Sequence, residues 1–240
     1  MKKIVVLTGA GISAESGIGT FRDSNGLWEN HRIEDVATPQ GWINNPALVL
    51  QFYNQRRAQL LTVAPNSGHF EIAGLEKDFD VTVITQNVDD LHERAGSTQV
   101  LHLHGELRKV RSTDDENLVY HWDKDLTLND LCENGFPLRP HIVWFGEAVP
   151  MLEEAAVVAE KADCFMIIGT SLQVYPAAGL MRYAPPDIPF VCVDPRPQVS
   201  GELARLRRLT VVAEPATTGV RKACEAMRST MGIKSAQPRL

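Results

Sequence analysis

The chain has 240 residues, of which 44% are hydrophobic and 22% charged, and this length suits one large α/β domain with a smaller inserted lobe. The net charge of −6 leaves no basic surplus to neutralise phosphates, which argues against a dedicated nucleic-acid-binding protein. The first apolar run, residues 4–7, is too short for a signal-peptide core, and no run is long enough to span a bilayer, so we expect a cytoplasmic protein with no membrane partner.

Short runs rich in valine and isoleucine recur along the chain and lack polar alternation, as strands buried on both faces of a parallel sheet do. Helical patterns lie between several of them. This alternation predicts a Rossmann-like parallel sheet with helices on both faces. The expected strands are residues 4–7, 81–84, 100–103, 142–144, 165–168, 190–193 and 209–212, and the expected helices are residues 46–61, 67–76, 152–161 and 217–231.

Two stretches interrupt this alternation. Residues 23–77 hold helical patterns without a convincing strand, and residues 107–139 are polar. We expect both to form a small inserted lobe and residues 232–240 to be a loose tail. The Rossmann-like domain would then consist of residues 1–22, 78–106 and 140–231.

A glycine-rich segment, GAGISA (residues 9–14), directly follows the first strand and fits the pattern Gly-x-Gly-x-x-Gly/Ala. In a strand-to-helix turn, such a segment lets backbone N–H groups approach a pyrophosphate, although a tight turn without a ligand is an alternative. A dehydrogenase would next need a strand ending in an acidic residue, about 20 residues further on. Glu29, Glu34 and Asp35 end no apolar run, which argues against hydride transfer.

The next segment, residues 17–23, offers two glycines, an aromatic ring and a guanidinium. A mobile flap that closes over a cofactor needs those parts. In a plain surface loop, by contrast, Phe21 would be exposed for no reason.

Polar residues follow the two central strands. Asn87 and Asp89, after strand 81–84, offer an amide and a carboxylate that suit a carboxamide such as nicotinamide, although this segment taken alone favours a helix N-cap. His102 and His104 would point to the same face of the next strand. His104 ends that strand before Gly105, which makes it the best candidate for acid–base chemistry near neutral pH.

Five successive segments resemble the signatures of the sirtuin (Sir2) family. They are GAGISAESGIGTFRD (9–23), TQNVDDLHERAGS (85–97), HLHGE (102–106), RPHIVWFGE (139–147) and GTS (169–171), in the order that the family has them. The resemblance implies an NAD-dependent protein-lysine deacylase that transfers the acyl group of a protein or peptide substrate to ADP-ribose and releases nicotinamide.

The resemblance also implies a role for individual residues. His104, the general base, and Asn87 would be catalytic, and the flap would carry Phe21 and Arg22. Val143, Trp144, Phe145 and Gly146 would form the edge that pairs with the substrate backbone. The implied cofactor-binding residues are Gly9, Ala10, Gly11, Ser13, Glu15, Phe21, Arg22, Trp28, Gln86, Asn87, Asp89, Gly169, Thr170, Ser171, Asp194 and Ala216.

The sequence departs from the family pattern in two places. Gly19 stands where the family usually has proline. The small lobe of the family usually carries two Cys-x-x-Cys pairs that hold zinc, whereas residues 107–139 contain only Cys132. We therefore expect no zinc and a lobe held by packing, through Leu118, Tyr120, Trp122, Leu126 and Leu128.

Three residues bear on the acyl group. Tyr53 and Arg56 are three apart in a helical pattern and so share a face, where a hydroxyl and a guanidinium suit a carboxylate. Together with the small Ala37, they resemble the sirtuins that remove succinyl and malonyl groups. The alternative is a solvated face of a surface helix.

Two other functions stay open. An NAD glycohydrolase or ADP-ribosyltransferase would use the same pocket and release ADP-ribose or modify a protein with it. A non-catalytic NAD-sensing module would bind NAD without releasing nicotinamide, and the missing cysteines of the small lobe favour it. We expect a monomer.

Overall fold

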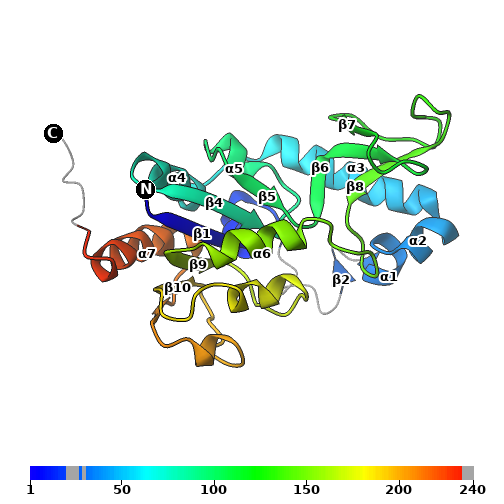
Figure 1. Ribbon diagram of the computed structural model, residues 1–240. Helices are drawn as coiled ribbons and strands as arrows, with labels where there is room; N and C mark the ends of the chain where they lie inside the picture. Colours follow the sequence, from blue (N-terminus) through cyan, green and yellow to red (C-terminus); the bar gives the residue numbers. More distant parts are fainter. Residues whose placement is uncertain (20–26, 29–30, 234–240) are drawn as a thin grey trace.

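The centre of the protein is a six-stranded parallel sheet with the strand order β11-β10-β9-β1-β4-β5 (Figure 1). The computed structural model describes residues 1–19, 27–28 and 31–233. The strands are β1 (Lys3–Thr8), β4 (Asp80–Thr85), β5 (Val100–His102), β9 (Cys164–Ile168), β10 (Phe190–Val193) and β11 (Leu209–Val212). The predicted Rossmann-like parallel sheet is confirmed.

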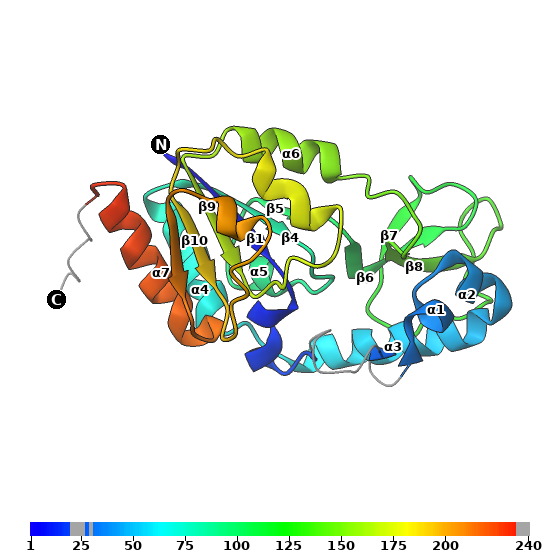
Figure 2. The same cartoon turned by 90° about the horizontal axis from the view of Figure 1, so that it is seen from below.

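Helices cover both faces of this sheet because successive strand residues are apolar on both sides. Ile4 and Val6 of β1 pack with α4 (Ser67–Gly74) and α7 (Ala216–Thr230), whereas Val5 and Leu7 pack with α6 (Leu152–Glu160). Figure 2 shows α6 on one side of the sheet and α4 and α7 on the other. The thiols of Cys164, in β9, and Cys192, in β10, are buried.

Helix α4 differs from the expected domain boundaries. The sequence analysis assigned residues 23–77 to the small lobe, yet Ile72 and Leu75 pack into the large core against α7. The helix begins at a capping box, in which the Asn66 side chain accepts a hydrogen bond from the N–H of Gly68 at 2.9 Å and the His69 ring accepts one from the N–H of Asn66 at 3.3 Å. The large domain therefore includes residues 67–77.

The small lobe combines helices with an antiparallel sheet. Helices α1 (Ile33–Val36), α2 (Pro39–Asn44) and α3 (Pro46–Thr62) precede it in the chain, with the short strands β2 (Leu27–Trp28) and β3 (His31–Arg32). Its sheet has the order β7-β6-β8 and is formed by β6 (Gly105–Ser112), β7 (Val119–His121) and β8 (Leu138–Ile142). The expected strand at residues 142–144 is wrong, because the chain there belongs to the end of β8 and leaves the sheet after Ile142.

Packing and hydrogen bonds hold this lobe together. Leu50, Val110, Leu126, Cys132 and Leu138 form its buried core, and Leu118, Tyr120 and Trp122 pack against it. The expectation was wrong for Leu128, which is 45% exposed. Among the described residues, no group of three or more His, Cys, Asp or Glu side chains is placed to hold a metal ion.

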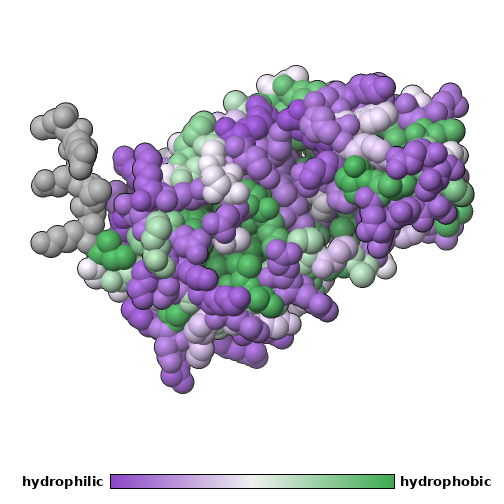
Figure 3. All heavy atoms as spheres, turned by 45° about the horizontal axis from the view of Figure 1, so that its top comes forward, coloured by the Kyte–Doolittle hydropathy of each residue, from purple (hydrophilic) through white to green (hydrophobic). Residues whose placement is uncertain are grey.

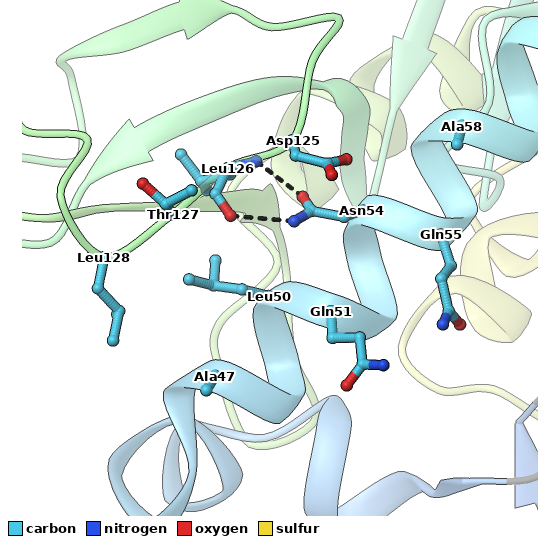
Figure 4. A pocket seen from close by; sticks show the side chains of 10 residues that line it. All are labelled: Ala47, Leu50, Gln51, Asn54, Gln55, Ala58, Asp125, Leu126, Thr127 and Leu128. Atoms are coloured by element: carbon cyan, nitrogen blue, oxygen red, sulfur yellow. Dashed lines mark hydrogen bonds between the residues drawn. The ribbon is translucent and has the colours of Figure 1, made fainter.

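Helix α3 is tied to the lobe by two polar side chains. Asn54 pairs with the backbone of Leu126 like a neighbouring strand, donating to its carbonyl at 3.0 Å and accepting from its N–H at 2.9 Å (Figure 4). The buried Arg57 donates to Asn54 Oδ1 at 2.7 Å and to the carbonyl oxygens of Leu107 and Lys124. Burial lowers the pKa of Arg57 to about 10, so its guanidinium stays charged at neutral pH.

We expect Asn54→Ala to lower the free energy of unfolding by about 2–3 kcal/mol, because three hydrogen bonds are lost and one of them comes from a charged donor. Gln51→Ala is the matched control, since Gln51 is exposed on the same helix and lines a surface groove together with Asn54 and Leu126 (Figure 4). Its effect should stay within about 0.5 kcal/mol. Urea denaturation of both variants measures the free energy of unfolding. Equal values for the two variants would contradict the role of Asn54 in holding α3 to the lobe.

The surface is mostly hydrophilic on the face shown in Figure 3, where hydrophobic residues gather near the middle of the molecule. No helix among the described residues is long and apolar enough to cross a membrane.

Candidate active site

A cavity of about 430 Å³ lies where the carboxyl ends of the sheet strands meet the small lobe. Ligands of open α/β sheets bind at such an edge. The cavity brings together nearly all the described residues that the sequence analysis selected. They are Gly9, Ala10, Gly11, Glu15, Ala37, Tyr53, Arg56, Gln86, Asn87, Asp89, His104, Val143, Trp144, Phe145, Gly146, Gly169, Thr170, Ser171 and Asp194.

Three selected residues cannot be placed. Phe21 and Arg22 lie outside the described residues, and so does the side chain of Trp28. Two further residues, Ser13 and Ala216, are buried behind the cavity wall rather than on it.

The glycine-rich segment has a packing role that its motif does not reveal. The N–H groups of Gly9 and Gly11 donate to the carbonyl oxygens of Ile168 and Gly169, at 3.1 and 2.8 Å. A Cβ atom on Gly11 would lie 2.6 Å from the Cα of Gly169. The glycine-rich segment can therefore contact the chain after β9 only because Gly11 has no side chain. Two 3-10 turns follow β1 here, Ala10–Ile12 and Ala14–Ser16, and the second is capped by Gly17 with a φ of 99°.

Asn87 and Asp89 are linked through Ser13. The amide of Asn87 donates to Ser13 Oγ at 3.2 Å, and the Ser13 hydroxyl donates to Asp89 Oδ2 at 2.9 Å. Burial raises the pKa of Asp89 to about 6, against the opposing hydrogen bonds from the Leu91 N–H and Ser13. Asp89 also accepts from the N–H of Leu91, the first residue of α5 (Leu91–Arg94), but the N-cap residue of this helix is Asp90, whose side chain makes no capping hydrogen bond.

His104 faces the cavity with one nitrogen already engaged. Its Nδ1 lies 3.0 Å from the carbonyl oxygen of Gln86, which can only accept, so Nδ1 carries the proton and Nε2 holds the lone pair. Burial lowers the pKa of His104. The neutral ring is therefore the form present at neutral pH, as a general base requires. Gly105 adopts a φ of 82°, and a Cβ there would lie 2.0 Å from the carbonyl oxygen of His141.

The segment after β8 borders the cavity but is not a free edge strand. The N–H groups of Val143 and Phe145 donate to the carbonyl oxygens of His104 and Ala37, each within 3.0 Å. The N–H of Trp144 donates to Glu147 Oε2 at 2.8 Å. The N–H groups of Val143, Trp144 and Phe145 are thus already engaged within the protein, unlike those of an open edge strand.

At the other end of the cavity, the predicted residues also hold the fold. The Glu15 carboxylate accepts from the N–H and hydroxyl of Thr217, at 3.1 and 2.7 Å, and so fixes the start of α7. Gln86 donates to Thr170 Oγ1 at 3.1 Å. Arg196 lines the cavity as well and was missed; its place just after the end of β10 is the signal that points to it.

Tyr53 and Arg56 line the cavity on α3, together with Ala37. Tyr53 is fully buried and accepts a hydrogen bond from Trp144 Nε1 at 3.1 Å. Burial raises the pKa of Tyr53, so its hydroxyl stays neutral and keeps a proton to donate. The guanidinium of Arg56 lies 4.4 Å from the ring centroid of Phe52. This geometry contradicts the alternative of a solvated helix face.

Comparison with known proteins agrees with the geometry. A model of the Sir2 family matches residues 9–176. An NAD-dependent protein deacylase of Helicobacter pylori is 61% identical over 196 residues, which are 82% of this chain and 86% of the relative. A Sir2 homologue solved with NAD has a TM-score of 0.82 at 37% identity, covering 96% of this chain and 91% of that one. A variant Sir2 homologue solved with ADP-ribose has a TM-score of 0.83 at 36% identity, covering 98% and 95%. The chain belongs to the Sir2 family.

Proposed function

We propose that the chain is an NAD-dependent protein-lysine deacylase that prefers succinyl- and malonyl-lysine to acetyl-lysine. The family membership and the names of the relatives support NAD-dependent deacylation. The acyl preference rests on one observation, namely that Tyr53 and Arg56 converge on the cavity from one face of α3.

The cavity residues fit NAD as a co-substrate. At one end, Asn87 and Asp89 line the cavity with an amide and a carboxyl group that suit a carboxamide, and Ser13 links the two side chains from behind. At the other end, the contact between Gly11 and Gly169 leaves the wall free of bulky side chains. NAD supplies the ribosyl carbon that receives the acyl oxygen as nicotinamide leaves.

His104 is placed to take a proton from a ribose hydroxyl. Its Nδ1–H is fixed on the Gln86 carbonyl, so Nε2 is the atom that receives the proton. Fixing the ring in one tautomer means that the base needs no rearrangement during the reaction.

The acid-binding end of the pocket would use two different donors. Tyr53 Oη accepts a hydrogen bond from Trp144, and a tyrosine hydroxyl can also donate one to an acyl carboxylate. Arg56 adds a planar cation that can bind a carboxylate with two hydrogen bonds. An acetyl group offers no carboxylate for these two donors to bind.

Mass spectrometry tests this proposal directly. The purified chain is incubated with NAD and matched acetyl- and succinyl-lysine peptides, and peptides and nucleotide products are both measured. We expect NAD-dependent loss of succinyl to exceed loss of acetyl, with O-succinyl-ADP-ribose as the co-product. Turnover of the acetyl peptide alone would overturn the acyl preference. NAD cleavage without deacylation would instead favour a glycohydrolase or ADP-ribosyltransferase.

A further inference from the structure

We propose that His102 is a positioning residue, an imidazolium that bridges the backbone of Asn87 to the Glu93 carboxylate and holds the nicotinamide end of the site in place. His102 is the last residue of β5 and is in register with Thr85, the last residue of β4. Its side chain is 8% exposed. This inference rests on the proposed role of Asn87 in binding the nicotinamide end of NAD.

Both hydrogen-bond partners of the His102 ring are acceptors. Nδ1 lies 3.2 Å from the carbonyl oxygen of Asn87, and Nε2 lies 2.6 Å from Glu93 Oε1. A carbonyl oxygen can only accept a hydrogen bond, and so can an ionised carboxylate. Both ring nitrogens must therefore donate, which only the protonated ring can do.

His104 provides an internal comparison two residues later. His102 and His104 contact the consecutive carbonyl oxygens of Asn87 and Gln86 through the same ring atom, Nδ1. They differ in what Nε2 meets, because that of His102 meets a carboxylate whereas His104 lines the cavity. The two histidines thus have different roles, because His102 is a fixed cation and His104 is a neutral base.

The charges around His102 favour the cation. Burial alone would lower the pKa of His102, but the hydrogen bond and the charge of Glu93 outweigh it, with a contribution from Glu106, and the pKa is raised. Burial would likewise raise the pKa of Glu93, yet its bond to His102 lowers it. The other titratable groups that act on this pair are Asp89, His92 and Lys109.

Deprotonation would break the bridge. A neutral ring donates from one nitrogen only, so it can serve either Asn87 or Glu93 but not both. Because the pKa of His102 is raised, the bridge is intact below that pKa and is lost as the pH rises through it. Release of the Asn87 carbonyl would loosen the segment that carries the Asn87 amide and the Gln86 carbonyl.

The variant Glu93→Gln tests the bridge without removing an acceptor, because the glutamine oxygen can still accept from Nε2 while the charge is gone. We expect its deficit in kcat/KM for NAD, relative to the unchanged protein, to appear as the pH rises through the lower pKa of the His102 ring in the variant. The deficit should shrink again above the raised pKa of the unchanged protein, where both rings are neutral. The deficit should reach about tenfold, mainly through KM for NAD, because a charge-assisted hydrogen bond is lost. The KM for the acyl peptide should stay the same.

Glu76→Gln is the matched control. Glu76 accepts from the N–H and the hydroxyl of Thr98 at 2.8 and 2.7 Å, away from the His102 ring, so this change should leave the pH profile of kcat/KM unaltered. Superimposable profiles for Glu93→Gln and the unchanged protein would overturn the positioning role.

A nitrogen-detected NMR titration of the His102 ring adds a readout that needs neither substrate nor turnover. We expect both ring nitrogens to be protonated at neutral pH, and Glu93→Gln to shift the titration to lower pH. A neutral ring at neutral pH would overturn the bridge itself. Because this measurement does not involve NAD, it separates failure of the bridge from failure of the proposed function.

Discussion

His104→Ala should reduce NAD-dependent deacylation by about 10²–10⁴-fold, because it removes the general base that faces the cavity. The fold should persist, since losing the hydrogen bond from Nδ1 to the Gln86 carbonyl costs only about 1 kcal/mol. In the unchanged protein, the lowered pKa of His104 places the acidic limb of the rate profile below the ordinary histidine value of 6.5. Activity should fall as the pH drops through that limb, because the protonated ring cannot accept a proton.

Single-turnover kinetics with saturating NAD, read together with circular dichroism, measure the rate and the fold of His104→Ala side by side. His121→Ala is the matched control, because His121 lies on β7 with its side chain 62% exposed, and its rate should match the unchanged protein. A folded His104→Ala variant that keeps its rate would remove His104 from the role of base.

Arg56→Met should lower desuccinylation at least about thirtyfold and leave deacetylation within about threefold, because roughly 2 kcal/mol or more is lost with a charge-assisted pair. Methionine keeps an unbranched apolar stem beside Phe52, where the guanidinium of Arg56 now lies 4.4 Å from the ring centroid. The packing of α3 should therefore survive, and the loss should be confined to substrates that carry a carboxylate.

Arg56→Lys separates charge from shape, because lysine keeps the positive charge but lacks the planar fork that binds a carboxylate with two hydrogen bonds. Its desuccinylation should fall between those of the unchanged protein and Arg56→Met. The measurement is kcat/KM for matched succinyl and acetyl peptides. Equal losses on both peptides would sink the assignment of Arg56 to the acyl pocket.

The sheet could be predicted from the sequence because its strands are apolar on both faces, as Val5 and Val6 of β1 illustrate. The boundary of the small lobe could not be predicted from the sequence. Residues 142–144 are as apolar as a sheet strand, but whether such a run joins the parallel sheet or ends an antiparallel one depends on pairing with β6, which is distant in sequence. Helix α4 was misplaced for the same reason, since its amphipathic pattern does not identify the core against which it packs.

The positions of the site residues could be predicted better than their contacts. Asn87 and His104 follow strand ends, and the parallel topology brings those ends together at one edge. The sequence around Asn87 and Asp89 does not indicate that Ser13 links their side chains, because Ser13 and Asn87 are 74 residues apart in the chain. The glycine motif likewise predicted a turn at Gly11 but not its packing against Gly169.

Helix α3 carries two pairs of functional residues, and the members of each pair are three residues apart in the sequence. Tyr53 and Arg56 line the cavity, while Asn54 and Arg57 hold the chain around Leu126. Because both pairs belong to one helix, the contacts of Asn54 and Arg57 with residues 124–126 also fix the side of α3 that faces the cavity. The acyl pocket is therefore supported from outside its own wall, by a segment that none of its lining residues belongs to.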